Sequence, residues 1–279
     1  MSHVTPADAG SGHAPATVRS PTVVGVNDAL DLPRSVLLAL WLAPEVGDLV
    51  SLLRAVQGDD EPHEVSTADG PTTSLAEAVR AWSTNRPVEA TALVLAPGDA
   101  GGAPASVSAA AIEAGECLLL RAGSRSWAAV PEVSAFGSDL EPGRLVTWHV
   151  TEVDDWRLAA HARNGSLQDA DRELRQGLIT VTEALVRLDV ARWHDEDADL
   201  VASLRDGALP HWRLPPHLDG RRARVLASAA RLRGIVALAT RDDGGAVSLW
   251  QADQRSAALR DVDRMARRAL AAAATTAGG

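Results

Sequence analysis

The sequence predicts an α+β protein, in which a small mixed α/β unit with a short sheet is followed by a C-terminal antiparallel helical bundle. Strand-like segments separated by Gly- and Pro-bearing turns lie between residues 88 and 153, and helical periodicity dominates from residue 166 onward. Net charge also changes sign along the chain. We expect a disordered tail at 1–21, an α/β domain at 22–155 and a helical domain at 156–279.

The α/β unit is expected to begin with helices. Pro33 suits the first position of a helix over residues 33–42, and a second short helical segment covers 46–56. Ser74 and Glu77 have the spacing of a capping box, which predicts a helix over 74–85.

Strand signals follow. We expect strands over 88–95, 117–121, 127–130 and 144–153, with a short helix over 106–114 between the first two. In the last strand, Val146, Trp148 and Val150 alternate with mostly polar residues. That alternation predicts one buried and one exposed face.

The remaining chain reads as helices. A long amphipathic helix begins near residue 166 despite Gly177, a shorter one covers 195–204, and a third covers 221–240. After a turn at 242–245, a last helix runs to about residue 272. Its expected inner face comprises Leu259, Val262, Met265, Ala266 and Ala269. Short connections between these helices favour an antiparallel bundle.

Charge is segregated along the chain. Residues 221–268 hold eleven arginines and five carboxylates, whereas residues 1–160 hold nine arginines and 21 carboxylates, and the whole chain has a net charge of -10. All 27 basic residues are arginine, a bias expected of a GC-rich genome. Lysine chemistry, such as a Schiff base, is therefore excluded.

Composition also limits the class of protein. Cys117 is the single cysteine, so internal disulfides and multi-thiolate zinc sites are excluded, and its apolar neighbours predict a buried thiol. The longest uninterrupted apolar run, 36–43, is far shorter than the roughly 20 residues of a membrane helix. No signal peptide is expected either. These features predict a cytoplasmic protein.

The candidate binding surface is the outer face of the last helix. Arginines at an i, i+4, i+7, i+8 spacing share the face opposite its apolar stripe, and Trp250 projects to the same side. An exposed tryptophan beside guanidinium groups suits an acidic partner. The alternative is a solvated polar face with Trp250 packed beneath the preceding helix. The candidate partner-binding residues are Trp250, Arg260, Arg264, Arg267 and Arg268.

Other constellations favour structural interpretations. The acidic run after His194 fits the first turn of a helix better than a metal site, although His194, Asp195 and Asp197 remain a candidate set. There is no Gly-x-Ser-x-Gly elbow, and the glycines at 98–102 lack nucleotide-loop spacing. We therefore predict no catalytic residue, cofactor or metal.

Several stretches carry a family resemblance. Residues 187–193, 242–247 and 250–255, together with 140–143 and the following Val146-Thr147-Trp148, resemble a family of uncharacterised actinobacterial proteins. The resemblance covers about half of the chain, mainly its carboxy-terminal part. It implies a high-GC actinobacterial source and cytoplasmic residence, and it assigns no catalytic residue.

Three functions stay open. The first is a non-catalytic interaction or regulatory protein that contacts an acidic protein, or a second copy of itself, through the basic helix face. The second is nucleic-acid binding through the same arginines, against which the overall acidity counts. The third, and least favoured, is a metal-assisted hydrolase.

Overall fold

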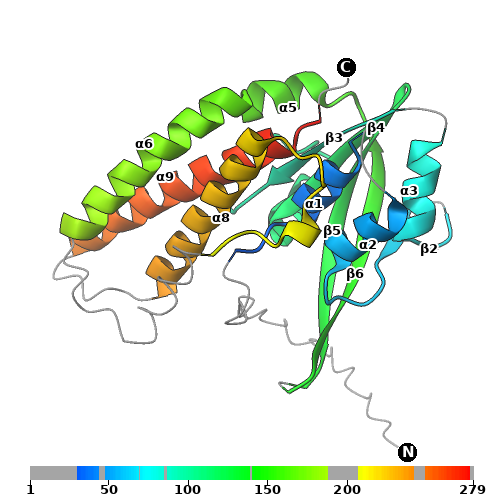
Figure 1. The fold of residues 1–279 in the computed structure, drawn as a ribbon, viewed down its shortest axis with the longest axis horizontal. Helices are drawn as coiled ribbons and strands as arrows, with labels where there is room; N and C mark the ends of the chain where they lie inside the picture. The colour runs from blue at the N-terminus through cyan, green and yellow to red at the C-terminus, as the bar shows by residue number, and fades with distance from the viewer. Residues whose placement is uncertain are drawn as a thin grey trace, which may run out of the picture.

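The computed structural model describes residues 30–43, 48–68, 70–84, 87–138, 140–187, 207–241 and 249–276. These residues form a mixed α/β fold with one six-stranded sheet. Figure 1 shows the sheet on one side of the molecule and three long helices on the other. The elements expected at 1–21, 195–204 and 242–245 lie outside the described residues.

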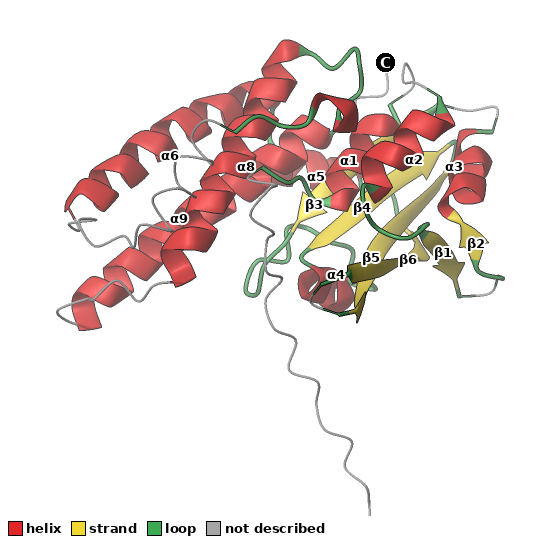
Figure 2. Cartoon of the chain, turned by 60° about the horizontal axis from the view of Figure 1, so that its bottom comes forward, coloured by secondary structure: helices red, strands yellow, loops and turns green. Residues whose placement is uncertain are grey.

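The sheet has the strand order β2-β1-β6-β5-β4-β3 (Figure 2). Neighbouring strands are antiparallel, except for the parallel pair β1 and β6. The four expected strands are confirmed, whereas β1 and β2 are not predicted, because they are too short to show alternation. The strands are β1 (Glu64–Thr67), β2 (Thr73–Ser74), β3 (Val88–Val94), β4 (Glu116–Ala122), β5 (Arg125–Gly137) and β6 (Pro142–Val153).

Helices cover both faces of the sheet (Figure 2). The first face packs against α1 (Arg34–Trp41), α2 (Leu49–Gln57) and α3 (Leu75–Ser83), and the second against α4 (Ser108–Ala114) and α5 (Arg157–Asn164). Strand β4 is apolar from Cys117 to Leu120 because alternate residues enter the two cores: Leu118 and Leu120 the first, Cys117 and Leu119 the second.

The alternation predicted for β6 is confirmed. Val146, Trp148 and Val150 are buried in the first core, whereas Leu145 and His149 on the opposite face are exposed. Strand β6 therefore has one face in the core and one toward solvent over this stretch.

The capping box is confirmed as well. The backbone N–H of Glu77 donates to Oγ of Ser74 at 3.3 Å, and Oε2 of Glu77 accepts the backbone N–H of Ser74 at 3.0 Å. This reciprocal pair starts α3. The expectation for Pro33 is wrong by one position, since Pro33 is the N-cap residue of α1 and Arg34 is its first helical residue.

Beyond the sheet, the carboxy-terminal helices pack on one another and on the sheet. They are α6 (Leu167–Arg187), α8 (Gly220–Arg241) and α9 (Leu249–Ala274), with a 3-10 turn, η1 (His211–Arg213). Helix α9 contacts α6 and α8 and also β3 and α1, and one apolar core runs from α1 to α9. A helical bundle separate from the sheet is therefore not confirmed, and the predicted domain division stays a prediction.

The end of α9 covers the outer edge of β3. Thr276 donates its backbone N–H to the carbonyl oxygen of Ala90 at 2.9 Å, and its Oγ1 accepts the N–H of Ala90 at 2.8 Å. Oγ1 of Thr91 lies 2.8 Å from Oγ1 of Thr275. An exposed strand edge invites pairing with other chains, so these contacts protect β3.

Two residues explain how α9 is held by its neighbours. Gly177 of α6 is buried against the side chain of Met265, so a larger residue would displace α6 from α9. Nη1 of Arg222 on α8 donates to the carbonyl oxygens of Ala273 and Thr275, each at 2.7 Å. The last turn of a helix leaves carbonyl groups without intrahelical partners, and Arg222 satisfies two of them.

A buried carboxyl lies where α1 meets β4. Oε2 of Glu116 accepts the backbone N–H of Ser35 at 2.7 Å, and Oγ of Ser35 is buried without a partner among the described residues. Burial raises the pKa of Glu116 above its ordinary value of 4.5. The folded protein therefore binds this proton more tightly than the unfolded chain does, and Glu116 destabilises the fold once it ionises.

We expect Glu116→Gln to raise the free energy of unfolding at neutral pH, because the amide keeps the acceptor for Ser35 and removes the buried charge. The gain over wild type should disappear as pH falls toward 4.5, where the carboxyl is protonated. Urea unfolding at several pH values measures both effects. Glu64→Gln, at an exposed strand position, is the control, and an equal gain in both variants would contradict the explanation.

Candidate functional site

Two of the predicted partner-binding arginines lie on the surface of α9. Arg260 is exposed and forms no ion pair or side-chain hydrogen bond with any described residue. Arg264 is 47% exposed, and its Nη1 lies 3.1 Å from Oδ1 of Asp261, one turn earlier. Asp261 is itself exposed, so this part of the helix presents charges of both signs.

The third predicted arginine is buried, and the expectation that it faces solvent is wrong. The side chain of Arg267 is only 5% exposed. Its Nε donates to Oδ2 of Asp263 at 2.7 Å, and its Nη2 lies 3.2 Å from Oδ2 of Asp99. Helical spacing places Arg267 on the face of Arg260, but the loop that carries Asp99 covers that face near the end of the helix.

Arg268, the fourth, is half-buried and lines a hollow beside this ion pair. The hollow is partly open to solvent and has room for about one water molecule. It lies between the β3–α4 loop, the end of α5 and the last turns of α9. Its lining residues are Leu93, Val94, Asp99, Gly101, Arg163, Asn164, Arg267, Arg268 and Ala271.

Asp99 is the centre of the polar contacts at this hollow. Its Oδ1 accepts Nη2 of Arg163 and the backbone N–H of Gly101, and its Oδ2 pairs with Arg267. Gly98 and Gly101 have φ values of 80° and 58°, which glycine adopts without strain. From the sequence, residues 98–102 are expected to form a plain loop, and no spacing relates them to Arg163 or Arg267.

The side chain of Trp250 and the set at His194, Asp195 and Asp197 lie outside the described residues. Within the described part of the chain, no group of three or more His, Cys, Asp or Glu residues is placed to hold a metal ion. His149 and His161 are exposed, and neither lines the hollow.

The single thiol and the described helices are as follows. Cys117 is buried as predicted, and burial raises its pKa to about 12, so the thiol stays protonated at neutral pH. Among the described helices, none combines the length and apolar character needed to cross a bilayer.

A buried histidine joins three parts of the sheet region. His63 is 1% exposed, its Nδ1 accepts Nε1–H of Trp148 at 3.2 Å, and its Nε2 lies 3.3 Å from Oδ2 of Asp60. Since Nδ1 is an acceptor, Nε2 carries the proton and donates to Asp60. Asp60 also pairs with Arg34 at 2.6 Å. The chain of contacts ties the start of α1 to β6.

Burial lowers the pKa of His63 below 6.5 and outweighs the attraction of Asp60 for the protonated form. For Asp60, burial alone would raise the pKa, but the hydrogen bond from His63 and the charge of Arg34 outweigh it and lower the pKa. The pair is therefore a neutral imidazole beside an ionised carboxylate at neutral pH.

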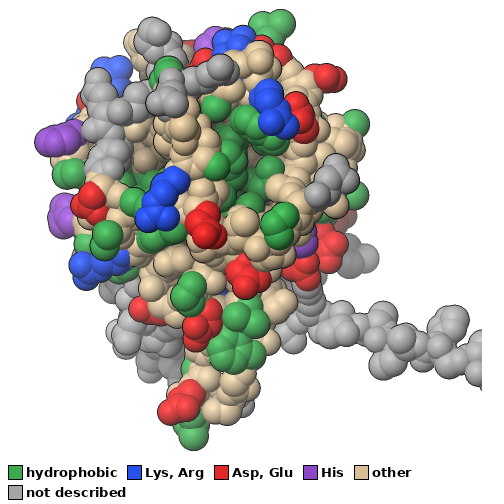
Figure 3. Space-filling model, turned by 90° about the vertical axis from the view of Figure 1, so that its right-hand side faces the viewer, with side chains coloured by type: hydrophobic (Ala, Val, Ile, Leu, Met, Phe, Trp, Pro, Cys, Tyr) green, Lys and Arg blue, Asp and Glu red, His purple; other side chains and the backbone are tan. Residues whose placement is uncertain are grey.

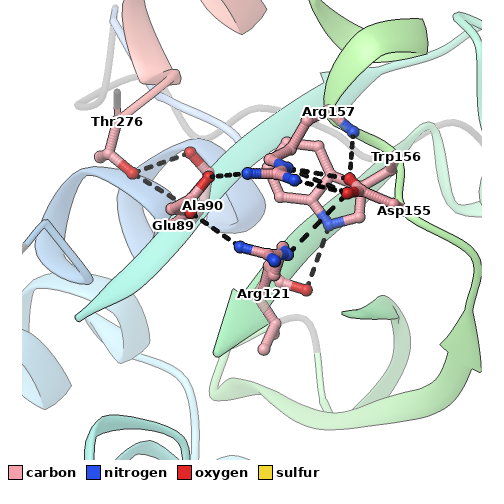
Figure 4. A network of polar contacts seen from close by, with 8 residues as sticks. Glu89, Ala90, Arg121, Asp155, Trp156, Arg157 and Thr276 are labelled. Carbon is pink, nitrogen blue, oxygen red and sulfur yellow. Dashed lines mark hydrogen bonds and ion pairs between the residues drawn. The ribbon is translucent and has the colours of Figure 1, made fainter. Parts of the chain in front are cut away.

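A ring of four alternating charges lies over β3 and β4 (Figure 4). Arg121 lies 3.0 Å from Glu89 and 4.0 Å from Asp155, and Arg157 lies 3.6 Å from Glu89 and 2.6 Å from Asp155. These contacts hold the start of α5 on the strands, and each charge has partners. Nε1–H of Trp156 adds a bond to the carbonyl oxygen of Leu120 at 3.1 Å (Figure 4). The ring is thus a structural ion-pair network.

The chain matches two protein-family models. Residues 35–162 match the family model described as Rv1486c-like protein, N-terminal domain, and residues 168–271 match Rv1486c-like protein, C-terminal domain. The two matches follow one another in the order of their names and cover most of the chain. The chain belongs to the Rv1486c-like proteins. The prefix of that name is mycobacterial, which agrees with the resemblance to an actinobacterial family.

The family boundaries relate directly to the hollow. Asp99 and Gly101 fall within the N-terminal match, and Arg267 and Arg268 fall within the C-terminal match. The hollow therefore lies where the two parts of a Rv1486c-like protein meet. Comparison with curated proteins and with solved structures found no match.

The His63 contacts predict a pH dependence of stability. Because the folded pKa lies below 6.5, the unfolded chain protonates first, and the contribution of His63 is lost as pH falls below 6.5. We expect the free energy of unfolding to fall between neutral pH and about pH 5, and to fall less in His63→Gln.

Denaturant unfolding at each pH tests this, with His149→Gln, at an exposed histidine, as the control. If His63→Gln does not fold, an NMR titration of the wild-type imidazole gives the same information. A His63 pKa at or above 6.5 would contradict the assignment.

Proposed function

We propose that this protein is a non-catalytic interaction protein that binds another protein through an apolar surface on the projecting part of the β5–β6 hairpin. This part, residues 133–146, is called the arm. The observation that carries the proposal is the exposure of large apolar side chains on a preformed two-stranded arm. Its support comes from strand pairing, side-chain exposure and local packing.

The arm extends beyond the rest of the sheet (Figure 1). Pairing of β4 with β5 ends at Ala129, and pairing of β1 with β6 ends at Thr147, so the five pairs from Val133↔Val146 to Gly137↔Pro142 have no third strand. Along this projection, Figure 3 shows apolar side chains among carboxylates at the lower end of the molecule.

Three apolar side chains on the arm are exposed: Phe136 at 45%, Leu145 at 50% and Leu140 at 93%. Phe136 pairs with Gly143, two residues before Leu145, so Phe136 and Leu145 lie on the same face. Exposed apolar groups that cluster on one face, with polar residues around them, are typical of protein interaction sites.

The two strands of the arm pack closely on each other. The ring of Phe136 lies directly over Gly143, where a side chain would collide with it. Pro142 in the arm and Pro131 just before it lack backbone N–H groups, which disfavours addition of another strand there. A partner is therefore expected to pack on the apolar face and not to extend the sheet.

A second candidate surface is the one expected from the sequence. Arg260 and Arg264 are exposed on α9 and available to an acidic partner, which a second copy of this acidic chain would also supply. Two exposed arginines beside Asp261 give a weaker contact than the arm. Nucleic-acid binding would rely on the same two arginines, and the overall charge of -10 opposes it.

Replacing Phe136 and Leu145 together by serine should abolish partner binding while the fold is kept, because both side chains project into solvent. Chemical crosslinking in the native host, followed by identification of the crosslinked protein and sedimentation of the purified pair, measures the loss. Leu158→Ser, at an apolar residue that is 83% exposed on α5, is the matched control and should bind normally.

A third variant, Arg260→Glu with Arg264→Glu, separates the two surfaces. Loss of the partner in this variant alone would transfer the contact to α9 and contradict the arm. A wild-type chain that stays monomeric and forms no crosslink with another protein would contradict an interaction role altogether.

A further inference from the structure

We infer that the partner of the arm contributes a basic amphipathic helix, which packs on the uncovered sheet face next to the arm. This inference rests on the proposed function and names the chemistry of the partner. It is carried by two exposed carboxylates that lie beside the apolar side chains of the arm. They belong to one row across three strands, here called the acidic row: Glu64 of β1, Thr147 of β6 and Glu132 of β5.

The strand register places the acidic row on one face of the sheet. Thr147 pairs with Glu64 across β1 and β6, and with Glu132 across β5 and β6. Paired residues point to the same side of a sheet, whereas neighbours along a strand point to opposite sides. Val65 and Val146, which adjoin the row, are buried in the first core. The acidic row therefore lies on the other face, where Glu64 and Glu132 are exposed.

The exposed apolar side chains of the arm lie on this same face. Leu145 precedes Thr147 by two residues on β6, and Phe136 pairs with Gly143, two residues nearer the tip. Positions two apart on a strand are separated by roughly 7 Å, so Leu145 borders the acidic row and Phe136 lies one step further out. A partner on this face would meet apolar groups and carboxylates side by side.

Helices of the molecule itself cover the neighbouring part of this face. Helices α4 and α5 pack on it over β3, β4 and the first part of β5, as far as Val130. Over β1, and over β6 from Leu145 to His149, no described helix covers it, and both of these side chains are exposed. The backbone of β6 is paired on both sides at the acidic row, so a partner cannot add there as a strand. A helix of the partner would continue the layer formed by α4 and α5.

The charge of the uncovered face favours a basic helix. Glu64 forms no ion pair or side-chain hydrogen bond with any described residue, and Glu132 pairs with the exposed imidazole of His149 at 2.9 Å. Arg144 of β6 is next to Leu145 in sequence and so points to the opposite face, where it lies 3.7 Å from Asp60. The two carboxylates thus have no arginine partner among the described residues, and Arg or Lys of a partner would complement them.

The spacing of these groups suits a helix that crosses the three strands. Glu64 and Glu132 are two strand spacings apart, roughly 10 Å, which is close to the rise of seven residues in an α-helix. Leu145 lies on β6, between the strands that carry the two carboxylates. Cations seven positions apart would reach the carboxylates, and an apolar residue three or four positions after the first cation would reach Leu145.

Binding of three synthetic helical peptides of about 18 residues to the full-length protein tests the inference. The first carries Arg at every seventh position with Leu between, the second has Glu in place of Arg, and the third has Ala in place of Leu. We expect the Arg–Leu peptide to bind at least about tenfold more tightly than the other two, and its affinity to fall as salt is added. Fluorescence anisotropy of labelled peptides at low and high salt measures both effects. Absence of binding by the Arg–Leu peptide, or equal affinity for the Glu peptide, would overturn the inference.

A double variant, Glu64→Gln with Glu132→Gln, locates the contact. It removes both charges, keeps the shape of the side chains, and should weaken binding of the Arg–Leu peptide by about fivefold and reduce its salt dependence. The matched control is Glu173→Gln with Asp253→Asn, which makes the same change in net charge at exposed positions of α6 and α9. The control should bind like wild type. Equal affinity in the Glu64 and Glu132 double variant and in wild type would overturn the inference.

Crosslinking in the native host separates failure of this inference from failure of the arm proposal. If the partner binds through apolar contacts alone, Phe136→Ser with Leu145→Ser abolishes the crosslink, the double variant at Glu64 and Glu132 keeps it in full, and only the basic helix is ruled out. If the crosslink survives in Phe136→Ser with Leu145→Ser, the arm is not the interaction site, and both proposals are overturned.

Discussion

The packing of the last turns of α9 against β3 and α1 is the contact on which the rest of the structure depends. The alanine-rich end of α9 is buried all round, and its small side chains let the helix backbone approach the sheet closely. Thr275 and Thr276 then bond to β3 and protect its edge. One helix therefore joins the carboxy-terminal half of the chain to the core of the amino-terminal half.

The same packing decides which charges are available. It brings α9 beneath the loop of Asp99, so Arg267 is enclosed among two carboxylates instead of facing solvent. The protein thus separates two kinds of surface. Polar donors gather at the junction of its two halves. Large apolar side chains are exposed on the arm, which is formed by β5 and β6, the two central strands of the sheet.

Local sequence patterns predict helices and strands well where the segment is long enough to show a side-chain period. The alternation in β6 and the capping box of α3 both lead to the observed structure. The alternation follows from burial of one face of the strand, and the capping box depends on contacts between neighbouring residues. Strands β1 and β2 are too short to show a period, and α5, which falls within the expected helical domain, packs on the sheet. The arm is missed because β5 loses its apolar alternation where neighbouring strands end.

The sequence by itself determined the α+β class, the main strands, the long helices and the buried state of Cys117, since hydrophobic periodicity follows directly from burial of one face. Only the tertiary structure decided that Arg267 is buried and that Arg163, Asn164 and Arg268 share one hollow with it. Helical spacing fixes the direction in which a side chain points around the axis of its helix. Which other segment covers that direction depends on contacts between residues that are far apart in the chain.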